Sequence, residues 1–310
     1  MLNVNRLKML RDVAARGTIA AAAEGLLMSS SAVSQQMAVL EREAGVPLLE
    51  RHGRGVRLTD AGVRLVHNTE RVLAALEQAE ADLVDSSRGI VGHLRVSAFP
   101  SAARTVLVPA LVEIGAAHPN LRISMVDLEP EEAIPALKSR AVDVALTYEW
   151  DLLPTLEDEG VEREQLFGER VYLALPVAHP AAASSQPVAL ATLAETEWIV
   201  GRDSTSMLEF VQSATRRVGF EPRTDFHSMD FDVILAAVEA GLGVALVPPL
   251  AFAYDLPGVA IREVADLELN RLTWAAIRRG SGETPGIHAV LASLRTHSAA
   301  VVARLPGPRN

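Results

Sequence analysis

Residues 29–43 of this 310-residue chain, SSSAVSQQMAVLERE, combine hydrogen-bonding side chains with the periodicity of a helix. Val33, Met37 and Leu40 recur at positions i, i+4 and i+7, which places them on one helical face. The opposite face carries small or neutral side chains: Ser30, Ser31, Ser34, Gln35 and Ala38. Such a face can enter the major groove of DNA, where base edges offer donors and acceptors and the phosphates repel acids. A serine-capped surface helix would show the same residues, so the neighbouring segments must decide.

The segments before this helix predict that it is the third of three. An apolar stripe indicates a first amphipathic helix and consists of Leu7, Leu10, Val13 and Ala14. Gly17 can end that helix in the left-handed conformation, and Thr18 can cap a second helix from Ile19 to about Leu26. Residues 27–29 then form a short turn. Helix, helix, short turn and helix is the helix-turn-helix arrangement.

A small β-hairpin, or wing, is predicted directly after the third helix. Two short apolar runs, residues 46–49 and 56–58, flank a tip that contains Gly53 and Gly55. The basic residues of this wing are Arg51, Arg54 and Arg57. Arginines in such a position can hold phosphates without reading the base sequence.

At this point the chain resembles the LysR-type transcriptional regulators of bacteria. The resemblance rests on the AAA of residues 21–23, SAVSQQ, AVLEREAGVPLLER, and RGVRLTDAG ending at Gly62. It covers nearly all of residues 3–62. Two positions depart from the family pattern: Ser30 stands where Gln is common, and Leu49 stands where Phe is common. The first departure leaves the base preference open, and the second is a core substitution.

The resemblance implies base-reading roles for four residues: Ser30, Ser31, Ser34 and Gln35. It implies phosphate contacts for three more: Gln36, Arg51 and Arg54. For each serine alone, capping or solvation is as good an explanation as a base contact.

Net charge is −10, which at first argues against a nucleic-acid partner. The charges are unevenly distributed, however. The first 60 residues carry a formal charge of about +2, and the remainder carries about −12. The acidic body should be repelled from DNA, so contact is expected only at the N-terminal module.

Three further exclusions follow from the residue content and from its order along the chain. The absence of cysteine excludes disulfides, thiolate metal sites and thiol catalysis, and it fits a reducing cytoplasm. Charged residues near the N-terminus argue against a signal peptide, and these are Arg6, Lys8, Arg11 and Asp12. The longest apolar run, residues 233–254, contains Glu239 and the Pro248–Pro249 pair, so it predicts a helix and a buried strand instead of a membrane span.

A long helix is predicted over residues 61–88, because proline is absent there and glycine occurs only near the start. A heptad-like seam runs along it, formed by Leu65, Thr69, Val72, Leu76, Ala79 and Leu83. The dimerisation contacts expected from this seam are Leu65, Val72, Leu76 and Leu83. Packing of the helix on its own domain is the alternative. A dimer would present two reading heads to a dyad-symmetric promoter site, and the resemblance implies a tetramer as a dimer of dimers.

Beyond a hinge at Arg88, Gly89 and Gly92, strand and helix patterns alternate. Such alternation predicts a parallel sheet with right-handed crossovers. The predicted strands are residues 93–99, 121–128, 142–148, 170–176, 197–201, 224–227, 243–248 and 271–278.

HLRVSAF, the HP at 179–180 and VEAGLGVALVP resemble the periplasmic-binding-protein-like effector domain of the LysR family. The expected fold is therefore an α/β effector domain of two β/α lobes behind a winged helix-turn-helix and a linker helix. The expected boundaries are 1–60 for the DNA-binding domain, 61–88 for the linker, 92–162 with 268–303 for lobe I, and 163–267 for lobe II.

Ligands of open α/β sheets lie beyond the carboxyl ends of the strands, which here face a cleft between the lobes. The residues nominated for effector binding are Ser101, Thr147, Tyr148, Ser204, Thr205, Met229 and Phe231. Ser101 and the helix that follows it would suit a carboxylate. Asp203 and Asp230 would oppose such an anion, and Arg104 or Arg202 could balance them. Ordinary N-capping is an equal alternative for Ser101, Ser204 and Asp230.

None of the sequence patterns that could indicate a catalytic or cofactor site has the required order or spacing. Gly241-Leu242-Gly243 follows a helix and leads into a strand, the reverse of a dinucleotide fingerprint. Asp230 and Asp232 are two residues apart near a helix start and do not face each other. The eight histidines have no metal-ligand spacing, and no Gly-x-Ser-x-Gly elbow occurs. No catalytic residue, metal or cofactor is expected.

The partners expected are DNA, a small effector and a second copy of the chain, with RNA polymerase left open. The rival hypothesis is a solute-binding or enzymatic β/α protein with an N-terminal interaction domain.

Overall fold

The computed structural model describes residues 2–52, 55–82, 90–155, 158–252 and 257–305. Three helices open the chain, namely α1 (Val4–Arg16), α2 (Ile19–Gly25) and α3 (Ser30–Ala44). Asn3, Thr18 and Ser29 cap them with side-chain oxygens. Gly17 and Gly45 end α1 and α3 with φ of 70° and 73°, conformations that suit glycine. The helix-turn-helix order predicted from sequence is confirmed.

The wing pairs β1 (Leu49–His52) with β2 (Gly55–Leu58) in antiparallel register. The first strand starts at Leu49, so the expected apolar run from Val46 mostly precedes it. Leu48 at 1% exposure belongs instead to the core under the helices, with Leu10, Val33 and Leu40. This single core positions both α3 and the wing.

Helix α4 (Asp60–Asp82) follows the wing, and the Thr59 side chain accepts a hydrogen bond from the Gly62 amide at 3.1 Å. At 1.5 Å per residue the helix is roughly 35 Å long. Its first half packs on α1, and Leu65 lies against the N-terminal core. Thr69 is buried and donates its hydroxyl to the Leu65 carbonyl. Val72 and Leu76 are exposed, at 45% and 36%. The seam therefore divides: its start faces the chain's own module, and its middle faces solvent. Leu83 lies outside the described residues.

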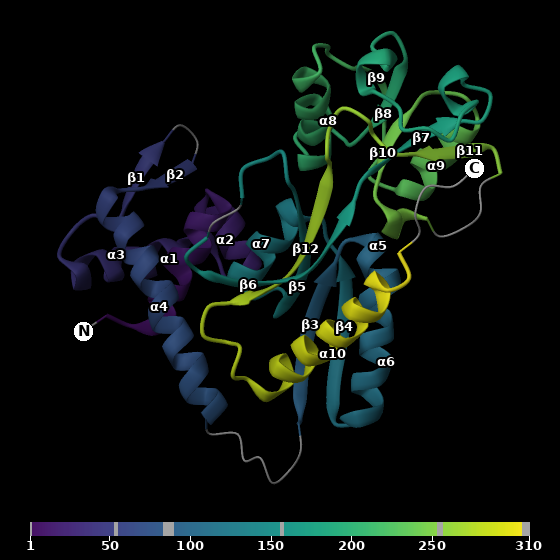
Figure 1. Cartoon of the computed structure of the whole chain (residues 1–310). Helices are drawn as coiled ribbons and strands as arrows, with labels where there is room; N and C mark the ends of the chain where they lie inside the picture. The colour runs from purple at the N-terminus through teal and green to yellow at the C-terminus, as the bar shows by residue number, and fades with distance from the viewer. Residues whose placement is uncertain (1, 53–54, 83–89, 156–157, 253–256, 306–310) are drawn as a thin grey trace.

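Lobe I contains a five-stranded sheet in the order β4-β3-β5-β12-β6. Strands β3 (Gly92–Ala98), β4 (Leu121–Asp127) and β5 (Val144–Trp150) are parallel, as predicted. Strands β6 (Val161–Arg170) and β12 (Asn270–Arg278) run antiparallel and continue between the lobes (Figure 1). Strand β6 was not foreseen, because a crossing was expected near residue 162. Its charged residues make ion pairs with neighbouring elements, which explains why its sequence lacks an apolar run.

Helices cover both faces of the lobe I sheet. The helix after β3 is composite: α5 (Pro100–Ala102), a π-helical turn (Ala103–Leu107) and α6 (Val108–Ala117). Pro109 lacks an N–H for the regular ladder, which accounts for the wider turn before it. Helix α10 (Pro285–Val302) packs beside α6, while α7 (Pro130–Lys138) packs on β5 and β12.

Lobe II departs from the all-parallel expectation. Strand β7 (Tyr172–Pro176) lies between β10 (Ala245–Val247) and β11 (Val259–Arg262) and is antiparallel to both. It enters the lobe almost directly from β6, so no crossover helix turns it parallel. Strands β8 (Glu197–Val200) and β9 (Arg223–His227) form a parallel pair, and single parallel bridges join Val188 to Val264 and Trp198 to Val244. The remaining elements are α8 (Ser206–Arg217), α9 (Phe231–Glu239) and short helical turns at Pro180–Ala182, Leu190–Leu193 and Pro249–Ala251.

The GLG segment ends a helix, as expected. Gly241 follows α9 with φ of 79°, a conformation that L side chains rarely adopt. A Cβ on Gly243 would lie 2.7 Å from the Glu197 carbonyl oxygen, so the two segments approach each other closely. Both glycines therefore have structural explanations that involve no nucleotide. Among the helices that the structure describes, none is long and apolar enough to cross a membrane.

Candidate functional site

Helix α3 presents its predicted polar face to solvent. Val33, Met37 and Leu40 are buried in the N-terminal core. The exposed residues on the other face include Ser30, Ser31, Ser34 and Gln35. The helix therefore has the two faces that DNA reading requires, one packed and one free to contact bases.

Some residues near this face already have intramolecular partners. Ser29 caps α3, and its hydroxyl lies 3.0 Å from that of Ser31. Gln36 is half-buried, and its carbonyl oxygen accepts a 3.4 Å hydrogen bond from Arg6. Arg6 in turn pairs with Glu43. Ser31 and Gln36 are thus oriented by neighbours before any DNA is present.

The wing is less completely described. Arg57 pairs with Glu50 across the hairpin at 2.8 Å, and both side chains are largely exposed. Arg51 lies in β1, but its side chain is outside the described set. Arg54 lies outside the described residues altogether. An exposed pair such as Arg57–Glu50 is weak in water, so Arg57 can exchange its partner for a phosphate.

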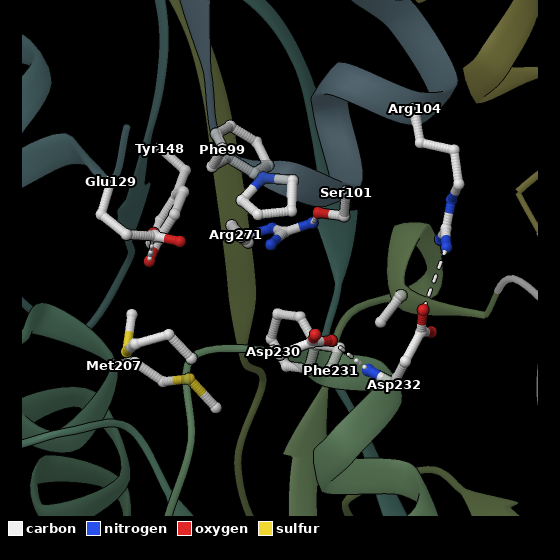
Figure 2. A pocket seen from close by; sticks show the side chains of 13 residues that line it. Phe99, Ser101, Arg104, Glu129, Tyr148, Met207, Asp230, Phe231, Asp232 and Arg271 are labelled. Carbon is white, nitrogen blue, oxygen red and sulfur yellow. Dashed lines mark hydrogen bonds and ion pairs between the residues drawn. The ribbon is translucent and has the colours of Figure 1, made fainter. Parts of the chain in front are cut away.

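A cavity lies between the two lobes (Figure 2). Lobe I supplies the end of β3, the start of α5, the β5 residue Tyr148 and the β12 residue Arg271. Lobe II supplies the starts of α8 and α9. Four of the nominated effector contacts line it: Ser101, Tyr148, Met229 and Phe231. The carboxyl ends of β3 and β5 thus open on the cavity, as the topology predicts.

Two nominated residues lie elsewhere in the cleft, and a third acts as a cap. Thr147 and Ser204 line a neighbouring groove, which Tyr148 also borders. Thr147 is buried, and its hydroxyl has no hydrogen-bond partner in the described part of the chain. Thr205 caps α8, accepting from the Leu208 amide and donating to the Arg202 carbonyl. It lines neither cavity.

Arg271 is the main cavity residue that sequence reasoning missed. It donates to Glu169 from Nε at 2.9 Å and from Nη2 at 2.7 Å, and both side chains are almost fully buried. Its Nη2 also donates to the Ser101 hydroxyl at 3.3 Å. The guanidinium carbon lies 4.9 Å from the ring centre of Phe99 and 5.3 Å from that of Tyr148. Arg271 therefore organises the lobe I wall. A charged residue at the start of a mostly apolar strand is the one sequence signal that pointed to it.

Glu129 and Tyr148 form a second polar unit of that wall. The Tyr148 hydroxyl donates to the Glu129 carboxyl group at 2.9 Å. Burial raises the pKa of Glu129, and the Tyr148 hydrogen bond opposes part of that shift. Burial, with Glu129 next in effect, raises the pKa of Tyr148 well above its ordinary value. Tyr148 therefore remains a hydrogen-bond donor at neutral pH.

Direct contacts join the lobes around the cavity. Trp150 of β5 stacks on Phe210 of α8, with ring centres 4.3 Å apart and planes 14° from parallel. The Ser206 amide donates to Glu131 at 2.8 Å, and Arg104 donates to the Leu250 carbonyl at 2.9 Å. The described conformation is thus one in which the lobes touch.

Comparison with known proteins assigns both parts of the chain to one family. The family described as "LysR substrate binding domain" matches residues 87–299. The family described as "Bacterial regulatory helix-turn-helix protein, lysR family" matches residues 4–63. The chain belongs to the LysR family. It is a LysR-type transcriptional regulator, with a DNA-binding helix-turn-helix domain and a two-lobed effector-binding domain.

Curated relatives of this LysR-type regulator span nearly its whole length. The probable HTH-type transcriptional regulator LrrA of Synechococcus elongatus is 31% identical, over 95% of this chain and 97% of the relative. The transcriptional dual regulator GltC of Bacillus subtilis is 27% identical, over 84% of this chain and 85% of the relative.

Solved structures show the same fold. A full-length OxyR variant from Pseudomonas aeruginosa superposes with a TM-score of 0.66 at 20% identity, over 95% of this chain and 98% of the other. Full-length BenM superposes with a TM-score of 0.58 at 21% identity, over 100% of both chains. Full-length CbnR in complex with its target DNA superposes with a TM-score of 0.54 at 24% identity, over 96% of this chain and 100% of the other.

Within the described residues, no group of three or more His, Asp or Glu side chains could hold a metal ion. His179 caps the turn Pro180–Ala182 by accepting from the Ala181 amide at 3.1 Å.

Proposed function

We propose that this regulator reads a dyad-symmetric promoter site with α3. The base contacts assigned to it are Ser30, Ser31, Ser34 and Gln35, and the phosphate contacts are Gln36, Arg51 and Arg54. The observation that carries the proposal is the exposure of the first four on a helix whose opposite face is anchored in the core. The mildly basic module and the acidic body favour contact at this end alone.

The reading heads are paired by α4 in this proposal. Val72 and Leu76 supply an apolar stripe that α4 does not bury against its own module. In the sequence, Leu83 continues the same heptad spacing. Leu65 lies at the other end of the proposed dimer contact, next to the N-terminal DNA-binding module. The resulting homodimer matches a two-fold DNA site, and two dimers form the tetramer that the family implies. The boundaries 1–60, 61–88, 92–162 with 268–303, and 163–267 describe its working parts.

The cavity between the lobes is the proposed effector site. A ligand there changes DNA binding only if it favours one arrangement of the lobes over another. Ser101, Tyr148, Met229 and Phe231 would contact it first, and Thr147 and Ser204 would follow from the adjoining groove. Thr205 would act through its cap of α8. The proposal includes action in the cytoplasm, where the chromosome lies, and no catalytic activity.

Substitutions on the reading face and wing test the proposal. Gln35→Ala should reduce the preference for the chain's own upstream DNA over a scrambled duplex, because a base contact is lost. Arg54→Ala should weaken both duplexes alike, because phosphates carry no sequence information. Gln186→Ala, the same kind of change at an exposed site of the effector domain, is the control. If neither Gln35→Ala nor Arg54→Ala changes binding measured by fluorescence anisotropy, this docking is wrong.

A further inference from the structure

We propose that the interlobe cavity takes a ligand bearing a protonated amine, held between Glu129 of lobe I and Asp230 of lobe II. The inference rests on the proposed function, since it names the chemical class of the effector for the same cavity. It replaces the carboxylate that Ser101 and its helix suggest from sequence alone.

The cations at the cavity are already engaged. The Arg271 guanidinium donates twice to Glu169 and once to Ser101. Arg104 donates to the Leu250 carbonyl and lies 3.8 Å from Asp232. An incoming carboxylate that took over the Nε and Nη2 donors of Arg271 would displace Glu169, whose other oxygen accepts from the buried Leu250 amide at 2.9 Å. Breaking a buried, fully bonded pair of this kind is unfavourable.

Two carboxyl groups remain without a cation. Among the residues that the structure describes, neither Glu129 nor Asp230 forms an ion pair. Glu129 accepts only the neutral Tyr148 hydroxyl from another side chain, and Asp230 caps α9 by accepting from the Asp232 amide at 2.8 Å. Figure 2 shows the two groups on opposite walls of the cavity, Glu129 beside Tyr148 and Asp230 beside Phe231. A ligand in the space between them meets negative charge from both lobes.

The other side chains around this space are neutral or already paired. Phe99, Tyr148 and Phe231 hold the Arg271 guanidinium against their rings, so its charge is balanced by these rings as well as by Glu169. The thioethers of Met207 and Met229 complete the lining and are soft, polarisable and neutral. An ammonium group would therefore exchange water for two carboxylates, in a lining whose own cations, Arg104 and Arg271, are already paired.

The placement also explains how such a ligand would act. Glu129 precedes α7 in lobe I, and Asp230 precedes α9 in lobe II. Two like charges on facing walls repel each other when the lobes approach. An ammonium between them converts that repulsion into attraction, so the ligand binds the closed arrangement more tightly than the open one.

Matched probes test the proposal on the full-length protein. The diamine putrescine and its dicarboxylate counterpart succinate form one pair, and benzylamine and benzoate form the other. Each is titrated at millimolar concentration by thermal shift and by isothermal calorimetry. The proposal predicts that the amines raise the melting temperature and the carboxylates do not. Glu129→Gln and Asp230→Asn should each weaken amine binding about tenfold or more, since each removes a charge-assisted hydrogen bond.

The controls separate this proposal from the proposed function. Asparagine still caps α9 and glutamine still accepts from Tyr148, so both variants should fold. Asp225→Asn removes an exposed carboxylate that lines neither cavity and should leave amine binding unchanged. Stabilisation by the carboxylates instead, or no stabilisation by either amine, overturns the amine proposal. Anisotropy with upstream DNA is measured in parallel: retained DNA binding leaves the proposed function standing, and lost DNA binding in the folded protein contradicts it separately.

Discussion

The guanidinium of Arg271 and the carboxylate of Glu169 form an ion pair of 2.7 Å whose two side chains are almost fully buried. The pair joins neighbouring strands β12 and β6 where both leave lobe I for lobe II. Glu169 also accepts from the Leu250 amide, and Arg271 also donates to Ser101. One ion pair thus links both connections between the lobes to the cavity wall.

Removing one partner of this pair should destabilise the protein strongly. In Glu169→Gln the Arg271 charge stays buried without a counter-ion, which should lower the free energy of unfolding by about 3–5 kcal/mol. Glu164→Gln is the matched control, because Glu164 pairs with Arg295 at 2.6 Å with both side chains near half exposed. Glu164→Gln should lower the free energy of unfolding by less than about 1 kcal/mol. Urea unfolding followed by circular dichroism measures both, and equal losses would refute the assigned importance of the buried pair.

Glu129 should make stability depend on pH in a defined direction. Its pKa is raised in the folded protein, chiefly by burial, while Tyr148, Arg271, Glu131 and Glu132 act on it from the surrounding elements. Below its ordinary value of 4.5 the group is protonated in both states and adds no penalty. As pH rises through 4.5 the unfolded chain ionises first, so the folded state is progressively disfavoured until pH passes the raised pKa.

Glu129→Gln should therefore melt at a higher temperature than the unsubstituted protein at pH 7. The difference should shrink towards zero as the pH falls to 4.5. Asp225→Asn, which removes an exposed carboxylate that does not act on Glu129, should show no such trend. Thermal melts of the variants and the unsubstituted protein from pH 4.5 to 7 measure this difference. A lower melting temperature for Glu129→Gln at pH 7 would contradict the burial argument.

The stacked rings of Trp150 and Phe210 should hold the lobes together. Phe210→Leu keeps an apolar side chain but removes the stacking, which is worth about 1 kcal/mol beyond the buried area. We expect a larger radius of gyration in X-ray scattering, because the lobes open more often. Phe220→Leu, which alters a tilted contact with Trp198 inside lobe II, should leave the radius unchanged. The same radius for all three proteins would show that the stack does not govern closure.

The exposed stripe on α4 should control dimerisation. Val72→Asp places a charge where the partner helix is expected and should shift the protein to monomers in sedimentation velocity. Val63→Asp provides a close control, because Val63 is similarly exposed on α4 but nine residues away, on the opposite face. Monomers produced by Val63→Asp and not by Val72→Asp would place the seam on the wrong face.

Local signals in the sequence were enough to predict the N-terminal module. Gly17, Thr18 and the Val33–Met37–Leu40 stripe each act within one or two turns of chain, and each appears in the structure as expected. Ser101, Tyr148, Met229 and Phe231 were nominated from strand ends, and they do line one cavity. Rules that act over short distances therefore gave both the reading helix and part of the cleft.

Features that depend on distant pairing were missed. Glu169 and Arg271 lie far apart in the chain, and nothing in either segment alone shows that they meet. Strand β6 was read as a crossing because its charges resemble a loop until Arg295 and Arg271 are seen beside it. The antiparallel β7 depended on how the chain enters lobe II, which helix and strand periodicity does not encode.

The salt dependence of binding to upstream DNA tests the central claim most directly. Anisotropy titrations of the chain's own upstream duplex and a scrambled duplex, repeated over a salt series, give affinity and sequence preference together. A DNA-reading regulator should prefer its own duplex, and its affinity should fall steeply with salt as phosphate contacts are lost. Folded protein that binds neither duplex at low salt, or binds both equally at every salt concentration, would contradict the account.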